Sequence, residues 1–270
     1  MPTQGLLHPG WFNQAILGPR GVPSYASPIE SAPAGTGSNE PAGFTFITSQ
    51  SWDSIPSNGW YVDIGTLGNN MDLITDGTAP ESPSGILRYA FSASFDDGGA
   101  AGSIEHTIIG GTKVYRRIVF RHSANWVAHN TGTNKMAFIW LNNSPMFFFN
   151  ANGTGAGEMV GDLTFQNSGM GIGGEIHFLP NLGSGTLARG EWHTFETVIQ
   201  SNTVGVADGW ILGWIDGIAT HDYQDLLMVT TGSNTWEYVS VYPIWGGDNG
   251  STPGVDMTWD IDHDYVSNHA

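Results

Sequence analysis

The sequence contains no cysteine, which excludes disulfide bonds, thiolate metal sites and cysteine nucleophiles together. Basic residues are also scarce: 8 Lys and Arg stand against 25 Asp and Glu, giving a formal net charge of -17. Negative charge on this scale repels phosphate backbones and anionic lipid headgroups. We therefore expect no nucleic acid partner, and stability must come from burial and from hydrogen bonds between strands.

Long apolar runs are missing as well. No stretch approaches the roughly 18 uninterrupted apolar residues that a membrane span needs. The opening MPTQGLLHPGWFNQ has neither the basic start nor the continuous apolar segment of a Sec-type signal peptide. Only 12% of residues are charged, and 38 Gly and 14 Pro punctuate the chain. This composition predicts little helix, many turns, no membrane span and no Sec-type signal peptide.

The remaining sequence has the pattern of an all-β protein. The pair Asp216-Gly217 separates apolar segments on either side and favours a two-residue type I′ hairpin turn, which needs φ > 0 at both positions. A single large antiparallel sandwich commonly reaches 270 residues. The predicted strands cover residues 44–48, 86–94, 103–108, 114–122, 135–142, 146–150, 161–165, 174–179, 192–200, 209–215, 218–221, 238–242 and 257–266.

Residues 1–43 contain too many Gly and Pro residues for a strand or a helix, so we predict an extended N-terminal arm before a domain at 44–270. The arm is nevertheless apolar in its first half, which a freely solvated tail would not favour. Two alternatives stay open: it packs on its own domain, or it contacts other protein subunits of an assembly. The residues that would make these contacts are Leu6, Leu7, Trp11, Phe12, Ile16 and Leu17.

Several segments, in order, resemble the concanavalin A-like jelly roll of lectins, laminin-G-like modules and certain polysaccharide lyases. They include SPSGILR (82–88), NKMAF (134–138), GEWHTFE (190–196), IWGG (244–247) and IDHDYVS (261–267). The resemblance implies an antiparallel two-sheet jelly-roll sandwich. It is strongest to a widespread group of bacterial and phage proteins.

The enzymes of this fold carry motifs that are mostly absent here. Glu175-Ile176-His177 partly matches the Gln-Ile/Val-His motif of alginate-lyase-like enzymes. The Glu-x-Asp-x-Glu pattern of the related glucanases is missing, and with it the carboxylate pair for retaining hydrolysis. In a lyase, Arg117 or Arg121 would neutralise the substrate carboxylate while His177 or a nearby Tyr abstracts the C5 proton. The alternative for His177 is a structural strand histidine.

Four of the eight basic residues lie close together at Lys113, Arg116, Arg117 and Arg121. Strand alternation places Arg117 and Arg121 on one face and Arg116 on the other. The outward pair could bind a uronate or a sulfate through planar guanidinium groups. The alternative, which we favour, is pairing with the protein's own carboxylates or with a neighbouring subunit.

Tryptophans offer a second route to sugar binding, because an aromatic ring packs on the apolar face of a pyranose. Trp126 and Trp245 flank predicted loops and are the expected surface candidates. Tryptophans in alternating strand patterns are assigned to packing. These are Trp192, Trp210, Trp214 and Trp259.

The last predicted strand carries Asp260, Asp262 and Asp264 at a period of two, which predicts one acidic face. Together with loop residues such as Asp248 and Asn249, these carboxylates could hold Ca²⁺. A solvated acidic face that protects a sheet edge is the alternative and the one we favour, so we expect no cofactor.

These observations favour a non-enzymatic structural or decoration protein of a phage particle or similar assembly, tethered by its arm on the virion surface or another extracellular assembly. The alternative is a carbohydrate-binding module or a polysaccharide lyase that acts on an acidic glycan.

Overall fold

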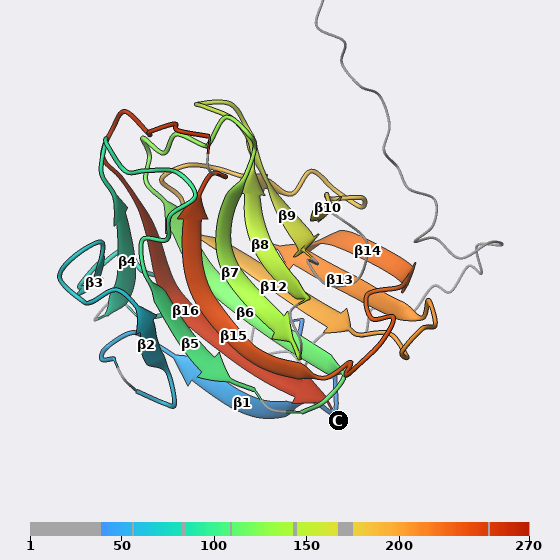
Figure 1. Ribbon diagram of the computed structural model, residues 1–270. Helices are drawn as coiled ribbons and strands as arrows, with labels where there is room; N and C mark the ends of the chain where they lie inside the picture. The colour runs from blue at the N-terminus through green and yellow to red at the C-terminus, as the bar shows by residue number, and fades with distance from the viewer. Residues whose placement is uncertain are drawn as a thin grey trace, which may run out of the picture.

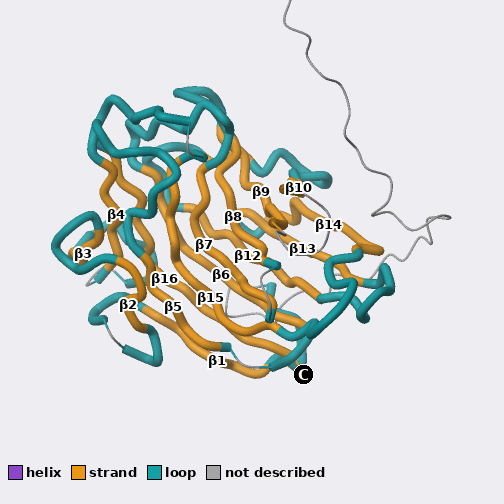
Figure 2. The backbone as a smooth tube through the Cα atoms, viewed as in Figure 1, coloured by secondary structure: helices purple, strands orange, loops and turns teal. Residues whose placement is uncertain are grey.

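The computed structural model describes residues 39–269 apart from residues 56, 83–84, 109, 143–144, 167–174 and 248. These ranges contain sixteen strands and no helix. The strands form two antiparallel sheets packed face to face, so the all-β jelly-roll prediction is confirmed (Figures 1 and 2). No helix in the described ranges is long and apolar enough to cross a membrane.

The first sheet, called sheet 1 here, has the strand order β14-β13-β12-β6-β16-β4-β3, and β1 pairs with β16. Its strands are β1 (Thr45–Gln50), β3 (Met71–Ile74), β4 (Ile86–Phe91), β6 (Lys113–His122), β12 (His193–Gln200), β13 (Gly209–Ile215), β14 (Ile218–Leu226) and β16 (Met257–His269).

The second sheet, sheet 2, has the order β10-β9-β8-β7-β15-β5-β2, and β11 pairs with β9. Its strands are β2 (Tyr61–Ile64), β5 (Ser103–Thr107), β7 (Asn134–Leu141), β8 (Met146–Asn152), β9 (Met159–Gln166), β10 (Glu175–Phe178), β11 (Thr186–Leu187) and β15 (Trp236–Trp245). In Figure 1 the reader looks onto the outer face of this sheet.

The main core fills the space between the sheets with aromatic and branched side chains. Phe149 of sheet 2 stacks on Phe195 of sheet 1 at 4.1 Å, and Phe120 meets Phe149 edge-on at 5.1 Å. Trp259 is fully buried there, as expected. A smaller apolar cluster, which includes Trp214, lies on the outer side of sheet 1.

The hairpin predicted at Asp216-Gly217 joins β13 to β14. Asp216 has φ 52° and Gly217 has φ 75°, as a type I′ turn requires. The Asp216 carboxylate accepts hydrogen bonds from the Thr194 amide at 2.8 Å and from His193 Nδ1 at 2.7 Å. The turn is therefore also tied to the neighbouring strand β12.

Strand β16 contains a bulge that changes which side chains share a face. The register shifts between Ile261 and His263. Asp260 points outward to Arg121, whereas Asp264 points into the core and binds Arg116. The predicted single acidic face is wrong for this reason, and within the described ranges no three His, Asp or Glu side chains converge on a metal position.

Most of the predicted arm, residues 1–38 with Leu6, Leu7, Trp11, Phe12, Ile16 and Leu17, lies outside the described residues. Residues 39 and 40 cross the outer side of sheet 1. Asn39 donates from its amide and from Nδ2 to Glu196 at 2.5 and 2.9 Å, and Glu40 accepts from the Tyr265 hydroxyl at 3.0 Å. The chain therefore enters the domain across sheet 1.

Candidate functional site

A line of charged side chains crosses the outer face of sheet 2 from its middle to one edge. Lys135 of β7 lies 2.8 Å from the Glu175 carboxylate of β10, and the other oxygen of Glu175 lies 3.9 Å from His177 Nε2. His177 Nδ1 lies 2.5 Å from Asp162 Oδ2 on β9. The period-two alternation of β10 brings Glu175 and His177 to the same face.

The environment of His177 suits a proton acceptor. Asp162 is fully buried and its Oδ2 also accepts a hydrogen bond from Thr164 at 3.1 Å. Since a carboxylate can only accept, Nδ1 of His177 carries the proton and the lone pair lies on Nε2. The His177 side chain is 36% exposed. The hydrogen bond to Asp162 raises the pKa of His177, which makes Nε2 a stronger base.

An aromatic row lies beside this line on β7 and β15. Trp140 stacks on Tyr238 at 5.1 Å and on Phe138 at 5.6 Å, and Phe138 contacts Tyr242 at 5.5 Å. Trp140, Tyr238 and Tyr242 are partly exposed. Lys135 lies 4.6 Å from the ring of Phe148, so the row and the charged line meet at Lys135. A row of this kind offers apolar surface to the flat face of a sugar ring.

Arg117 and Arg121 lie on the opposite side of the molecule, on the outer face of sheet 1. Arg117 pairs with Glu81, and Arg121 pairs with Asp260 at 2.7 Å and with Asp76 at 2.5 Å. Pairing with the protein's own carboxylates, the alternative favoured from the sequence, is what the structure shows. The structure does not bring these arginines together with His177, so a lyase site built from all three is not formed.

Trp126 and Trp245 are buried, with exposed fractions of 3% and 2%. The expectation that their rings lie at the surface is wrong. Trp126 packs edge-on against Phe91 at 5.3 Å, and Trp245 donates its ring N–H to the Val127 carbonyl at 2.7 Å. The loops at this end of the sandwich extend the core instead of exposing aromatic rings, so neither residue can stack on a sugar in this conformation.

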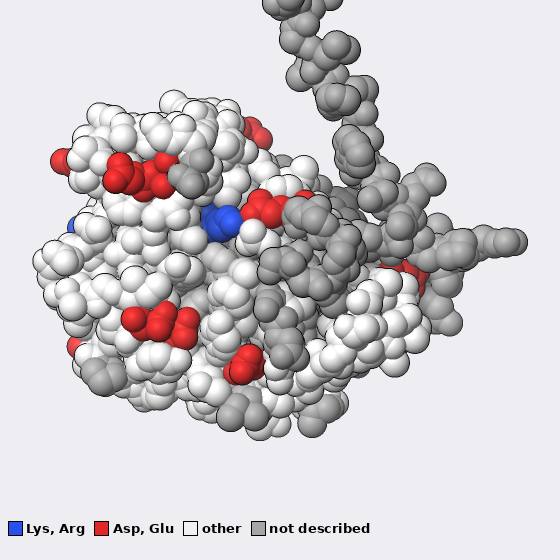
Figure 3. All heavy atoms as spheres, viewed as in Figure 1, with Lys and Arg blue, Asp and Glu red and all other residues white. Residues whose placement is uncertain are grey.

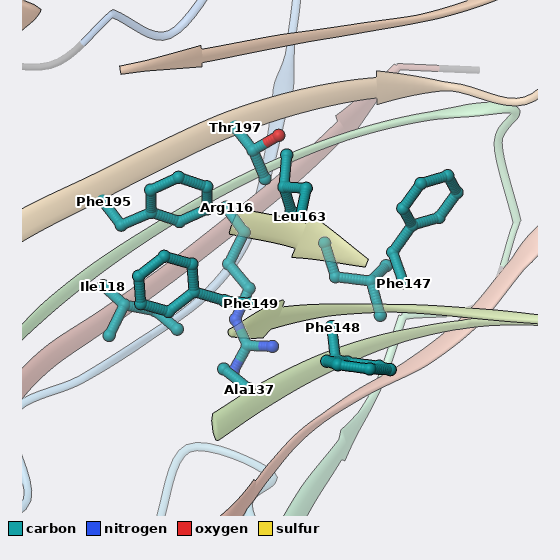
Figure 4. Close-up of a pocket in the computed structure, with 10 residues that line it drawn as sticks. Arg116, Ile118, Ala137, Phe147, Phe148, Phe149, Leu163, Phe195 and Thr197 are labelled. Carbon is teal, nitrogen blue, oxygen red and sulfur yellow. The ribbon is translucent and has the colours of Figure 1, made fainter. Parts of the chain in front are cut away.

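A small cavity of about 10 Å³ lies between the sheets, lined by Arg116, Phe147, Phe149, Leu163 and Phe195 among others (Figure 4). This volume is at the lower limit for one water molecule. The cavity is therefore a packing defect of the core. We take the outer face of sheet 2 as the candidate site because the charged line and the aromatic row lie there.

Comparison with known proteins identifies the fold. No family model matches the chain, and no curated protein matches it. The solved alginate lyase Aly36B superposes with a TM-score of 0.59 at 16% identity over 82% of this chain and 96% of the lyase. The endo-beta-1,4-glucuronan lyase of the fungus Trichoderma reesei gives 0.57 at 17% identity, over 83% and 96%. The chain has a concanavalin A-like jelly-roll fold.

The alginate lyase vAL-1 from Chlorella virus gives a TM-score of 0.57 at 11% identity, over 78% of this chain and 93% of the viral enzyme. Identities this low show the shared fold alone. Several proteins similar in fold are thus enzymes that act on polysaccharides. Lys135 was not singled out from the sequence, and Trp140 was considered for sugar stacking but ranked below Trp126 and Trp245. The alternation in 135–142 places Phe138 and Trp140 opposite Ala137 and Ile139.

Proposed function

We propose that this protein is a polysaccharide lyase that acts on an acidic glycan at the outer face of sheet 2. The observation that carries the proposal is the His177–Asp162 pair. It leaves Nε2 of the partly exposed His177 ring as the base, 3.9 Å from the Glu175 carboxylate that pairs with Lys135. The aromatic row supplies a surface for neighbouring sugars. The similar folds of an alginate lyase and a glucuronan lyase support the same class of chemistry.

The residues can be assigned to the steps of a β-elimination. A uronate carboxylate replaces Glu175 as the partner of Lys135, and the ammonium group stabilises the negative charge that develops when the C5 proton leaves. His177 Nε2 takes that proton. The C4–O bond then breaks as the C4=C5 double bond forms, and the imidazolium returns its proton to the leaving oxygen. Asp162 holds the ring and stabilises its protonated form.

The test is incubation with a panel of uronate-containing polymers while the absorbance of the unsaturated product is followed. His177→Ala should lower kcat/KM by at least about 100-fold, the typical contribution of one acid–base group. Lys135→Ala should lower it by at least about 100-fold, as removal of one group that stabilises transition-state charge typically does. The matched controls Arg117→Ala and Arg121→Ala, on sheet 1, should keep activity within about twofold. Absence of unsaturated product from every polymer, or loss of activity only in the arginine variants, would refute the proposal.

The role in a phage particle or similar assembly, which the sequence favoured, stays a prediction. The residues that would carry it lie within 1–38, outside the described residues. Removal of residues 1–43, the predicted arm, should abolish incorporation into the assembly and leave the β domain folded; normal assembly by the truncated protein would contradict it.

A further inference from the structure

The basic residues of the described chain are distributed very unevenly between the two sheets. Among the lysines and arginines that the structure describes, only Lys135 presents its charge on the outer face of sheet 2. Arg116 lies in the core, and Arg189 donates to main-chain carbonyls of loops. The others lie on the outer side of sheet 1: Arg88, Lys113, Arg117 and Arg121. A glycan on sheet 2 therefore meets one positive charge.

Carboxylates surround the aromatic row on the same face. Tyr61 of β2 donates its hydroxyl to Glu105 of β5 at 3.0 Å, on the side of the row away from Lys135. Burial, followed by the negative charges of Asp63 and Glu105, raises the pKa of Tyr242. The pKa of Tyr238 is raised by burial and then by Glu105, Glu237 and Asp63. On this face Figure 3 shows acidic atoms in several places and few basic ones.

This arrangement treats the sugars of one chain differently according to where they bind. A uronate at Lys135 finds a cation. A uronate stacked on Trp140 or Tyr238 lies on the side of the face that carries Glu105, Glu237 and Asp63. For a separation of about 6 Å in water, one such carboxylate would lower affinity by about threefold. Neutral sugars lose nothing there, because stacking on an aromatic ring does not depend on charge.

We infer that the glycan bound by this face is a heteropolysaccharide in which uronates are separated by neutral sugars, and not a run of consecutive uronates. The inference rests on the proposed function, because it takes the outer face of sheet 2 as the substrate surface. Alginate and glucuronan consist of consecutive uronates. It therefore assigns this chain a substrate class different from those that the similar lyases are named for.

The test is a calorimetric titration of the full chain with oligosaccharides of equal length. The probes are an oligoglucuronate hexamer, a hyaluronan hexamer, in which glucuronate alternates with a neutral amino sugar, and a gellan fragment with one uronate per four sugars. At low salt, the hyaluronan hexamer or the gellan fragment, whose uronates are separated by neutral sugars (the alternating probes), should bind about tenfold more tightly than oligoglucuronate. At about 0.5 M salt the difference should shrink, because the repulsion is screened.

Charge removal on each sheet gives a matched pair of variants. The double variant Asp63→Asn/Glu105→Gln should reduce the difference between the probes to about twofold. Asp72→Asn removes an exposed carboxylate from β3 of sheet 1 and should leave the difference unchanged. Unchanged discrimination in the double variant would show that these carboxylates do not select the glycan, which would overturn the inference.

The outcomes separate this inference from the lyase proposal. Binding of an alternating probe without unsaturated product would leave the inference standing and refute the lyase. Preferential binding and cleavage of oligoglucuronate at low salt would refute the inference and support the lyase. Binding of none of the three probes would overturn the inference.

Discussion

Arg116 of β6 binds both carboxylate oxygens of Asp264 on β16, at 3.1 Å from Nε and 2.6 Å from Nη2. Its Nη1 crosses to sheet 2 and donates to the carbonyl oxygens of Phe138 at 2.7 Å and Ser240 at 3.2 Å. Both charged side chains are buried. One guanidinium group therefore ties sheet 1 to the two strands of sheet 2 that carry the aromatic row.

Removal of one partner of this pair should be far more costly than removal of both. Arg116→Leu leaves Asp264 in the core without its counter-ion and should lower the free energy of unfolding by about 3–5 kcal/mol. The double variant Arg116→Leu/Asp264→Leu should recover most of this loss, because a buried ion pair is often no more stable than apolar side chains. Urea unfolding measures both, and a double variant as unstable as the single one would contradict this account.

The His177–Asp162 pair should set the acidic limb of the pH–rate profile. His177 acts as a base only when neutral, and its pKa is raised by Asp162, so the wild-type limb should lie above the ordinary histidine value of about 6.5. Asp162→Asn removes the negative charge and should move the limb to lower pH while also lowering kcat. A limb at unchanged pH would show that another group accepts the proton. Asp222→Asn, on the other sheet, is a suitable control.

Trp140 should contribute directly to glycan affinity. Its ring is partly exposed and held between Phe138 and Tyr238, so a bound sugar meets a fixed surface. Trp140→Ala should weaken binding by about 1 kcal/mol, or about fivefold. Trp192→Ala, which removes the ring stacked on Arg121 at 4.4 Å on sheet 1, should not change affinity. Equal losses in the two variants, measured by calorimetry, would argue against sheet 2 as the binding face.

The β13–β14 turn requires glycine at its second position. Gly217 has φ 75°, and a Cβ there meets no atom within 4 Å, so only backbone strain opposes a side chain. Gly217→Ala should cost about 1 kcal/mol of stability. Gly77 is equally open, with no atom within 4 Å and no positive φ, and Gly77→Ala should be nearly neutral. Thermal unfolding of the two variants measures this difference. Equal unfolding midpoints would show that the positive φ of Gly217 does not make glycine necessary in this turn.

Buried His221 should make the fold sensitive to mild acid. Burial lowers its pKa from 6.5 to about 4, so the unfolded chain takes up this proton at a higher pH than the folded one. Above about pH 6.5 His221 is neutral in both states and the free energy of unfolding is at its full value. As the pH falls toward about 4, protonation of His221 in the unfolded chain lowers the free energy of unfolding by up to about 3 kcal/mol. His221→Gln should show a weaker dependence of unfolding free energy on pH between about 7 and 4. A parallel profile would contradict this assignment.

Much of the fold follows from local pattern. Alternating apolar residues and the Asp216-Gly217 turn are short-range signals, and they located most strands and the hairpin. Strands β2 and β3 have only four residues each, too few for a repeated alternation of apolar and polar residues to mark them. The bulge in β16 depends on pairing with β6, which lies far away in the sequence, and the faces of Asp260 and Asp264 could not be assigned without it.

The candidate site was only partly predictable. His177 was found through a short motif, whereas a single lysine such as Lys135 carries no signal until the sheet places it beside Glu175. Both faces of β7 are apolar, with Ala137 and Ile139 on one and Phe138 and Trp140 on the other, so alternation could not tell core from surface for Trp140. The burial of Trp126 and Trp245 depends on how loops fold over the end of the sandwich, which pattern alone does not predict.

The contacts of Asn39 and Glu40 place the first described residues of the chain on the outer side of sheet 1, opposite the face that carries Lys135 and His177. A tag, a bead or a larger body joined directly before Asn39 would approach the domain from the outer side of sheet 1, the side opposite to Lys135 and His177. An array of this domain immobilised through a link at Asn39 should therefore present the outer face of sheet 2, the proposed glycan surface, to the surrounding medium.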